Sequence, residues 1–418
     1  MAWFILLFLP FAVSFAMSRL LISVSVKDAP DGERKFQESP VPTAGGLAIL
    51  SGLAVPLLVI TVLAGTGPLA LAGGLYTVQP FGGWVIFVIA LGLLGALDDV
   101  FGLSAFLKLV LLAAGAAAVA AQLPAVDLPV PFQFGVPGEN ATAMPSGGSV
   151  QGSAIIAAVL AIWILVFTNA ANFMDGADGL AFGCLAIMFA GVAIGLGIAY
   201  RPMLDYVDEP TRVVLLTPLM AVMAIAGFVA WNLRGQIYGG DTGALSIGGL
   251  FSVFAAFTGA HVGIWYPLTL ALPFLVDAGL TLVYRALLRQ PLLSGHREHA
   301  YQLLIRRGAS PVRVAILWWG FSLICLVSAV FSAARADPSN MTGAAVFGAL
   351  LVLGVGLWIW QRIAFRSRPR RMRTTERVKL TPDPPSPASA GTTLADATNG
   401  RGAQATGRQG ADTGALAD

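Results

Sequence analysis

Long apolar segments alternate with short polar ones along this chain as far as residue 362. A helix needs roughly 20 predominantly apolar residues to cross a lipid bilayer, and the pattern offers eleven segments near that length. Each segment is apolar around its whole circumference, so we expect a bundle of membrane-spanning helices and not amphipathic surface helices. The predicted spans are 2–24, 44–65, 79–97, 104–122, 153–171, 179–200, 213–232, 244–260, 263–284, 313–333 and 343–362.

The composition agrees with a membrane protein. Hydrophobic residues make up 56% of the 418 residues and charged residues only 11%, whereas soluble domains average about 25% charged residues. Both cysteines, Cys184 and Cys325, lie in apolar runs and are interpreted as buried hydrophobic residues. We therefore predict an all-α integral membrane protein, a polytopic bundle of about eleven transmembrane helices.

Lysine and arginine are unevenly distributed between the predicted spans. Short cytoplasmic loops are enriched in these residues, and here they gather after odd-numbered spans, above all after the ninth and the eleventh. Only Arg201, Arg212 and Arg335 lie on the other side. We therefore expect the N-terminus outside and the C-terminus in the cytoplasm. The first segment lacks a basic start and a small-residue cleavage site, so it is interpreted as a retained span and not a signal peptide.

The composition changes near residue 362. Residues 1–362 form the predicted membrane domain, and residues 363–418 form a cytoplasmic tail that is basic at its start. Beyond about residue 380 the tail is rich in Pro, Gly, Ala and Thr and almost free of large apolar residues, which is typical of disordered segments. The outer loop 123–152 carries no motif and is interpreted as a connector.

Five polar segments all follow odd-numbered spans, so all five are predicted to face the cytoplasm. Polar and ionisable groups are costly in a membrane and usually functional there. Their convergence on one side predicts a single active site on the cytoplasmic face. The segments are ESPVPTAGG (38–46), ALDDVFGLSAFLK (96–108), TNAANFMDGADGL (168–180), WNLRGQIYGGDTGALSIGG (231–249) and SGHREHAYQLLIRRG (294–308).

Three acidic positions mark ends of predicted helices. Asp98 and Asp99 are adjacent, and two carboxylates in a poorly solvated place favour a shared proton or a bound cation. The alternative is that they mark the membrane boundary and cap the following helix. Asp241 stands among glycines at the start of the eighth span, where backbone amides suit phosphate and a carboxylate suits a divalent cation. Its alternative role is that of a helix cap beside a tight turn.

The segment TNAANFMDGADGL has a polar residue at every third position. On an ideal helix each step of three residues turns the side chain back by about 60°, so only neighbouring pairs share a face. Two glycines loosen the backbone, which lets the carboxylates point into one cavity; the alternative is a polar helix end with a glycine-rich turn. The four residues are Asn169, Asn172, Asp175 and Asp178.

Two of the three histidines lie in the loop after the ninth span, as His296 and His299 beside Arg297. Cationic and imidazole groups are what a phosphate-rich substrate requires, although a basic loop is also a topology signal. The third histidine, His261, is interpreted as interfacial. Acidic groups able to hold Mg²⁺ and a cationic loop together indicate phosphoryl transfer. The bilayer location indicates that one substrate is a lipid.

These motifs resemble those of the polyprenyl-phosphate N-acetylhexosamine-1-phosphate transferases, glycosyltransferase family 4. The resemblance rests on PTAGG, LDDVFGLS, NFMDGADGL, GGDTGALSIGG and HREHAYQLL, in the family's order, and runs from the first span to about residue 362. The family includes phospho-N-acetylmuramoyl-pentapeptide transferase, in which three consecutive histidines are expected in the last cytoplasmic loop. Because HREHAYQ stands there instead, the chain is most similar to the O-antigen-initiating undecaprenyl-phosphate transferases.

The resemblance implies transfer of a sugar 1-phosphate from a UDP-N-acetylhexosamine to undecaprenyl phosphate. The reaction would depend on Mg²⁺, or on Mn²⁺ in its place, and would release UMP. Its lipid-linked product would be the first intermediate of a cell-surface glycan such as lipopolysaccharide O-antigen. The expected location is the bacterial inner membrane, with the lipid bilayer and no nucleic acid as partner. The mechanism stays open between direct attack by the lipid phosphate and an aspartyl-phosphate intermediate. The oligomeric state stays open between a monomer and a homodimer.

The resemblance also implies roles for individual residues. Either Asp98 or Asp99 activates or orients the lipid phosphate, and Asp241 binds the metal. The predicted catalytic residues are Asp98, Asp99, Asp241, His296 and His299, and the predicted substrate-binding residues are Asn172, Asp175, Asp178, Arg297 and Lys108.

A secondary transporter that uses the acids for ion coupling is the alternative function. It predicts acids in the middle of spans and an internal repeat. Here the acids that we singled out lie at cytoplasmic helix ends, and the two halves show no convincing repeat, so the sequence favours the transferase.

Overall fold

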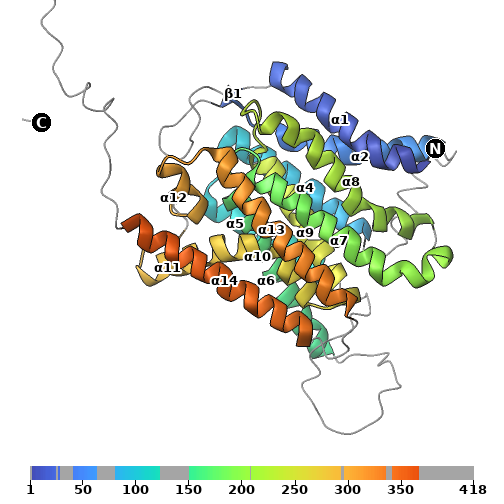
Figure 1. Ribbon diagram of the computed structural model, residues 1–418. Helices are drawn as coiled ribbons and strands as arrows, with labels where there is room; N and C mark the ends of the chain where they lie inside the picture. The colour runs from blue at the N-terminus through green and yellow to red at the C-terminus, as the bar shows by residue number, and fades with distance from the viewer. Residues whose placement is uncertain are drawn as a thin grey trace, which may run out of the picture. The chain divides into compact units, whose positions relative to one another are not determined.

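The computed structural model describes residues 2–24, 27–28, 41–63, 81–122, 150–207, 209–292, 296–335 and 341–366. Within these ranges the chain is a bundle of helices (Figure 1). In the first half these are α1 (Ala2–Val24), α2 (Gly45–Leu63), α4 (Phe81–Phe101), α5 (Ala105–Ala120), α6 (Val150–Met174) and α7 (Leu180–Tyr200). Two short strands, β1 (Lys27–Asp28) and β2 (Val41–Pro42), pair antiparallel with Lys27 opposite Pro42.

The second half continues the bundle. It contains the 3₁₀ helix η2 (Arg201–Tyr206), α8 (Glu209–Asn232) and α9 (Gly240–Val262). One interrupted rod follows, made of α10 (Trp265–Phe274), the π-helical segment η3 (Leu275–Gly279) and α11 (Leu280–Leu287). The chain then forms the short α12 (Ala300–Arg306), α13 (Pro311–Ala334) and α14 (Met341–Arg366).

Each of the eleven predicted spans overlaps one of these helices or, for 263–284, the interrupted rod, and residues 64–65 and 79–80 of the second and third predicted spans lie outside the described residues. In the described part of the chain, nine helices are long and apolar enough to cross a membrane. Two shorter apolar helices, 45–59 and 105–120, coincide with the second and fourth predicted spans. The prediction of an all-α polytopic membrane protein is therefore confirmed, whereas the count of eleven spans and the orientation stay predictions.

Helix α9 lies at the centre of the bundle and packs against α2, α4, α6, α7 and α10. Glycines lie where the backbones of these helices approach one another most closely, as expected where helices associate through small residues. A Cβ added at Gly95 of α4 would lie 2.3 Å from the Thr242 nitrogen, and one at Gly46 of α2 would lie 2.2 Å from the Gly243 nitrogen. The backbones of α2 and α4 therefore touch the first turn of α9, which brings the end of α4 beside Asp241.

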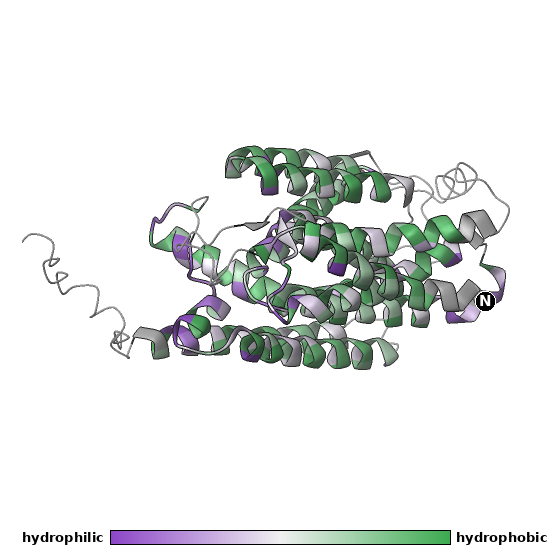
Figure 2. Ribbon diagram, turned by 90° about the horizontal axis from the view of Figure 1, so that it is seen from above, coloured by the Kyte–Doolittle hydropathy of each residue, from purple (hydrophilic) through white to green (hydrophobic). Residues whose placement is uncertain are grey.

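Polar residues gather at one end of the bundle. Figure 2 shows hydrophobic colour along most of the helices and the largest concentration of hydrophilic colour on the loops and short helices at the left. In Figure 1 that end carries β1 and α12 and lies opposite the start of α1. The predicted convergence of the polar segments on one side agrees with this arrangement.

The described residues all belong to one compact unit, Met1–Ser367. Helix α14 continues to Arg366, four residues past the predicted domain end at 362. Several predicted features lie outside the described residues: most of the tail, 367–418; most of the outer loop, 123–149; and residues 38–40 and 294–295 of two polar segments.

Candidate active site

Four helices place one polar side chain each at a common point. Asp98 lies in the last turn of α4, Lys108 in the first turn of α5, Asn172 in the last turn of α6 and Asp241 in the first turn of α9. The Lys108 ammonium donates to Asp98 Oδ2 at 2.7 Å and to Asp241 Oδ2 at 2.9 Å. Asn172 Nδ2 donates to the same Asp241 oxygen at 3.4 Å. The structure thus brings together four of the predicted site residues, from segments up to 143 residues apart.

The pair of carboxylates is suited to a divalent cation. Asp98 and Asp241 already converge on one positive charge, the Lys108 ammonium. Asp98 Oδ1 is buried and has no hydrogen-bond donor in bonding geometry among the described residues. The same residues contain no group of three His, Cys, Asp or Glu side chains arranged to hold a metal alone. Mg²⁺ commonly takes only one or two protein carboxylates and completes its shell with water and substrate phosphate, so the donor set fits it.

Asp99 has a different environment from its neighbour. Its Oδ1 accepts from the Asp241 backbone N–H at 2.9 Å, and its Oδ2 accepts from the Thr242 N–H at 3.1 Å and the Thr242 hydroxyl at 2.8 Å. Gly240 leaves room for this contact, since it has φ +66° and a Cβ there would lie 2.6 Å from Asp99 Oδ2. Asp99 therefore caps α9 from the end of α4. The helix that follows in sequence, α5, is capped by Ser104.

The loop between α6 and α7 places Asp175 and Asp178 beside this point. Burial raises the pKa of Asp175 to about 8, and the nearby carboxylates of Asp241, Asp99 and Asp178 add to the shift. Asp175 therefore carries a proton over most of the neutral range. Burial also raises the pKa of Asp178, against the opposing effect of a hydrogen bond from Tyr238.

Asn232 fixes this loop to the one before α9. Its Oδ1 accepts from the Gly179 N–H at 2.7 Å, and its Nδ2 donates to the Ile237 carbonyl at 2.8 Å. The side chain is buried, and Gly179 has φ +73°, a conformation that favours glycine. The two glycine-rich motifs, DGADG and GGDTG, are thereby held in register with each other.

The loop around HREH forms a second group of residues. His299 is buried, and its ring stacks on Phe173 with centroids 5.7 Å apart and lies 4.9 Å from the ring of His296. Burial lowers the pKa of His296 to about 4, and the positive charges of His299, Arg285 and Arg362 add to the shift. His296 is therefore a neutral imidazole near pH 7. Arg297 accepts a hydrogen bond on its carbonyl from Arg306 at 3.3 Å.

The HREH loop meets the rest of the site through Phe173 and Tyr301, not through the Lys108 ion pairs. The hydroxyl of Tyr301 donates to the Phe173 carbonyl at 3.0 Å, two residues before Asp175. His299 is enclosed by aromatic rings, a position that suits a residue supporting the loop as well as it suits a catalytic residue. The predicted catalytic role of His299 therefore stays a proposal.

Sequence reasoning missed four polar residues of this region. Tyr238 directly precedes the motif GGDTG, Thr242 lies within it beside Asp241, and Tyr301 lies within HREHAYQ; each belongs to a quoted segment in which the sequence does not single it out. Asp277 left a clearer signal, because an acid in the middle of the apolar run LPFLVDAGL is a functional candidate by default. The other three became visible only through their contacts.

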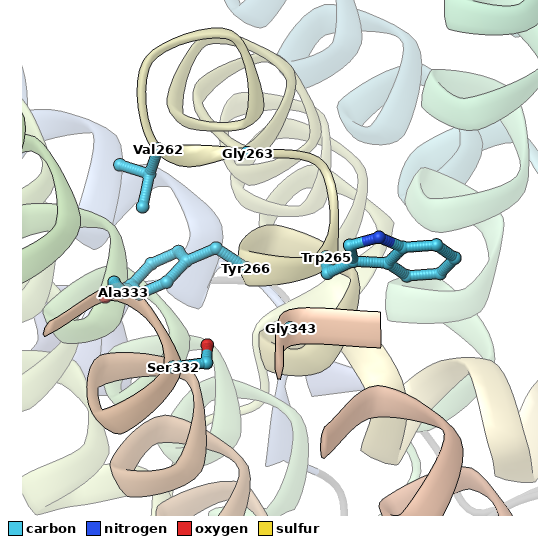
Figure 3. Close-up of a pocket in the computed structure, with 7 residues that line it drawn as sticks. All are labelled: Val262, Gly263, Trp265, Tyr266, Ser332, Ala333 and Gly343. Atoms are coloured by element: carbon cyan, nitrogen blue, oxygen red, sulfur yellow. The ribbon is translucent and has the colours of Figure 1, made fainter. Parts of the chain in front are cut away.

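A small cavity lies at the other end of α9 and is lined by apolar residues and two hydroxyl groups (Figure 3). The 22 residue steps from Gly240 to Val262 span about 33 Å, which separates this cavity from the carboxylates. The Tyr266 hydroxyl is already bound to the Gly191 carbonyl at 2.7 Å. No charged side chain is among its lining residues, Val262, Gly263, Trp265, Tyr266, Ser332, Ala333 and Gly343, so it is no candidate for the reaction.

The carboxylate site lies within a region that matches a known family. Residues 81–259 match the family described as glycosyl transferase family 4. A probable undecaprenyl-phosphate N-acetylglucosaminyl 1-phosphate transferase of Bacillus subtilis is 27% identical over 326 residues, covering 76% of this chain and 78% of the relative. A phospho-N-acetylmuramoyl-pentapeptide-transferase of Latilactobacillus sakei is 30% identical over 258 residues, which cover 58% of this chain and 72% of the relative. A second phospho-N-acetylmuramoyl-pentapeptide-transferase, from Levilactobacillus brevis, is 25% identical and covers 78% of this chain and 93% of the relative.

Proposed function

Because the chain belongs to glycosyl transferase family 4, the polyprenyl-phosphate N-acetylhexosamine-1-phosphate transferases, we propose that it transfers such a sugar 1-phosphate from a UDP-sugar to undecaprenyl phosphate. UMP is the second product. One observation carries the proposal: Asp98, Lys108, Asn172 and Asp241 meet at one end of the bundle, within the region that matches the family.

The reaction exchanges one phosphoanhydride for another. An oxygen of the lipid phosphate forms a bond to the β-phosphorus of the UDP-sugar, and the bond from that phosphorus to the UMP oxygen breaks. The two anhydrides are chemically similar, so the equilibrium is near balance, and use of the product by a later glycosyltransferase pulls it forward. The protein has to hold two phosphate groups together and spread their negative charge.

Asp241 and Asp98 would hold Mg²⁺, which when bound neutralises charge on the diphosphate and on the departing UMP. Lys108 contacts both carboxylates and is placed to bind substrate phosphate as they take up the metal. Of the two adjacent acids, Asp98 has the oxygen without a donor, so we assign it the task of orienting and deprotonating the lipid phosphate. Asp99 instead positions the first turn of α9 and with it Asp241.

The protonated Asp175 and the amide of Asn172 are donors suited to the nucleotide-sugar. Asp178, paired with Tyr238, would support the same side of the pocket. His296 is neutral and half-buried, so it can both donate and accept hydrogen bonds with the sugar or phosphate. Arg297 would add positive charge from the same loop.

We place this site on the cytoplasmic face of a bacterial inner membrane and the product at the start of a lipid-linked cell-surface glycan. The basic loops after odd-numbered spans support the orientation. The motif HREHAYQ supports the O-antigen-initiating subgroup, and the name of the Bacillus relative makes UDP-N-acetylglucosamine the first donor to test. A transporter is not favoured, because the carboxylates and the lysine meet at helix ends and the relatives are transferases.

The test measures UMP release by the purified full-length chain in lipid nanodiscs that contain undecaprenyl phosphate. UDP-N-acetylglucosamine and other UDP-N-acetylhexosamines are offered one at a time, with Mg²⁺ and after EDTA treatment. We expect release with at least one donor, its loss with EDTA and its recovery with added Mg²⁺. No release with any donor, together with ion-coupled uptake into vesicles, would overturn the proposal.

Asp241→Asn tests the assigned metal site against a matched control, Asp205→Asn. Asp205 is an exposed acid in η2, in the connection between α7 and α8. We expect Asp241→Asn to lower kcat by more than about 100-fold, as removal of a charge-stabilising group does, and Asp205→Asn to leave it unchanged. Substantial turnover of the Asp241 variant at saturating Mg²⁺ contradicts the assignment.

A further inference from the structure

Asp277 is a buried carboxylate in the interior of the bundle and is only 2% exposed. It lies in η3, where the rod formed by α10 and α11 adopts π-helical geometry. Such segments interrupt the regular hydrogen-bond ladder and are frequent at functional sites. An acid within a membrane-spanning segment is costly unless it is hydrogen-bonded, so its partners indicate why it is there.

The closest partners of Asp277 are the first backbone amides of α12, and the Thr281 hydroxyl one turn further along its own rod donates to Oδ1 at 3.5 Å. Oδ1 accepts from the Ala300 N–H at 2.7 Å, and Oδ2 accepts from the Tyr301 N–H at 3.2 Å. The imidazole Nδ1 of His299 lies 3.6 Å from Oδ1. A carboxylate from another helix thus acts as the N-terminal cap of α12. A helix of seven residues is not stable by itself, so α12 depends on such contacts.

Tyr301 connects α12 to the DGADG loop. Its hydroxyl donates to the Phe173 carbonyl at 3.0 Å, while the Phe173 ring stacks on His299. A Cβ added at Gly176 would lie 2.2 Å from the same hydroxyl. The Tyr301 side chain is therefore seated against the backbone on both sides of Asp175, at Phe173 and at Gly176.

We propose that Asp277 is a positioning residue for sugar-phosphate transfer, because it docks α12 and, through Tyr301, holds the HREH and DGADG loops as one unit. Asp277 itself touches no substrate in this scheme. It fixes the backbone from which His296 and Asp175 present their side chains. The kinetic part of the inference rests on the proposed function, whereas the coupling between the two loops does not.

Amide hydrogen–deuterium exchange of the full chain in nanodiscs tests the coupling without any substrate. Asp277→Asn replaces one acceptor oxygen by an NH₂ group that faces a backbone N–H. We expect exchange to speed up by about 10-fold or more in peptides covering residues 300–306 and 172–179, the loss that follows from one hydrogen bond to a charged group. Tyr301→Phe removes only the hydroxyl, so it should speed exchange in 172–179 and leave 300–306 unchanged.

The matched control is Thr269→Val, two turns earlier in the same rod. Thr269 is equally buried, but its hydroxyl bonds only the Trp265 carbonyl of its own helix at 2.7 Å. It should leave exchange in both peptides at the wild-type rate. Unchanged exchange in 300–306 for Asp277→Asn would overturn the docking role, and unchanged exchange in 172–179 for Tyr301→Phe would overturn the connection. The second variant decides the connection even where Asp277→Asn does not fold.

Kinetics on the proposed reaction supply a readout that general destabilisation does not move. Because both loops are assigned to the nucleotide-sugar, Asp277→Asn and Tyr301→Phe should each raise the KM for the UDP-sugar by about 10-fold. The KM for undecaprenyl phosphate and the activity of Thr269→Val should stay near wild type. A fall in kcat with both KM values unchanged would overturn the positioning role. Absence of wild-type activity would instead count against the proposed function and leave the exchange result standing.

Discussion

Asp98 and Asp99 are adjacent in sequence but are predicted to respond differently to the same substitution. Asp98 carries the Lys108 ion pair on one oxygen, and its other oxygen is buried with no donor in bonding geometry among the described residues. Both oxygens of Asp99 are occupied by the first turn of α9. Replacing each by Asn in turn changes the same atoms on neighbouring residues, so each variant is the control for the other.

The expected magnitudes follow from these contacts. Loss of a catalytic proton acceptor costs about 10²- to 10⁴-fold in rate, which we expect of Asp98→Asn, with little change in stability because Lys108 keeps Asp241 as a partner. Asp99 accepts three hydrogen bonds, each worth about 1.5–3 kcal/mol when the acceptor is charged. Asp99 is solvent-exposed, and the Asn side chain keeps one acceptor oxygen. We therefore expect Asp99→Asn to lower the free energy of unfolding by about 2 kcal/mol in total. Displacement of Asp241 should then lower kcat by roughly 10-fold.

Three measurements on each variant separate the two roles: kcat for UMP release, the Mg²⁺ concentration at half-maximal rate, and the apparent melting temperature in detergent. Asp99→Asn should lower the melting temperature and raise the Mg²⁺ requirement, because Asp241 loses its support. Asp98→Asn should raise the Mg²⁺ requirement as well, because Asp98 is one of the two proposed metal ligands, but it should lose far more activity than Asp99→Asn and do so at an unchanged melting temperature. An Asp99 variant that melts like wild type yet loses more than 100-fold in kcat would refute the division of roles.

Gly46→Ala should destabilise the fold by about 1–3 kcal/mol or more, since its Cβ would lie 2.2 Å from a backbone nitrogen of α9; Gly348→Ala, with nothing within 4 Å, should be neutral or slightly stabilising in the same thermal assay. The pKa of Asp175, raised from 3.8 to about 8, predicts stability that is fully present below pH 4 and lost as the pH rises through 8. Asp175→Asn should flatten that pH profile of the melting temperature, and an unchanged slope would contradict the burial argument. Asn232→Ala strips partners from two buried backbone groups and should cost about 3 kcal/mol; a wild-type melting temperature would show that water replaces them.

The helices were predictable because their cause is local. A run of apolar residues long enough to cross a bilayer must satisfy its backbone internally, and a helix does so whatever its neighbours are. The boundaries of α1 (Ala2–Val24) agree with the predicted 2–24, and those of α7 (Leu180–Tyr200) differ from 179–200 by one residue. The predicted span 263–284 overlaps the rod from Trp265 to Leu287, but the apolar pattern does not predict the π-helical interruption of that rod. That interruption accompanies the contacts of Asp277 with α12, which lie outside the span itself.

The candidate site was predictable as a set of motifs but not as a set of partners. Asp98, Asn172 and Asp241 could be singled out because a polar residue beside a membrane span is expensive and therefore informative. No rule of spacing links Lys108 to Asp241 across 133 residues. Nor does the sequence distinguish Asp98 from Asp99, since they are identical neighbours until the first turn of α9 is placed against one of them.

The sequence by itself determined the class of the molecule, its helices, and the family to which its motifs belong, because hydrophobicity and motif chemistry are properties of short segments. The tertiary structure alone decided which carboxylates pair with the Lys108 ammonium, which acid caps which helix, and how the HREH loop contacts the DGADG loop. These depend on close approach of distant backbones, allowed by glycines such as Gly46 and Gly95. Contacts of that kind arise only when separate segments pack, so no single segment encodes them.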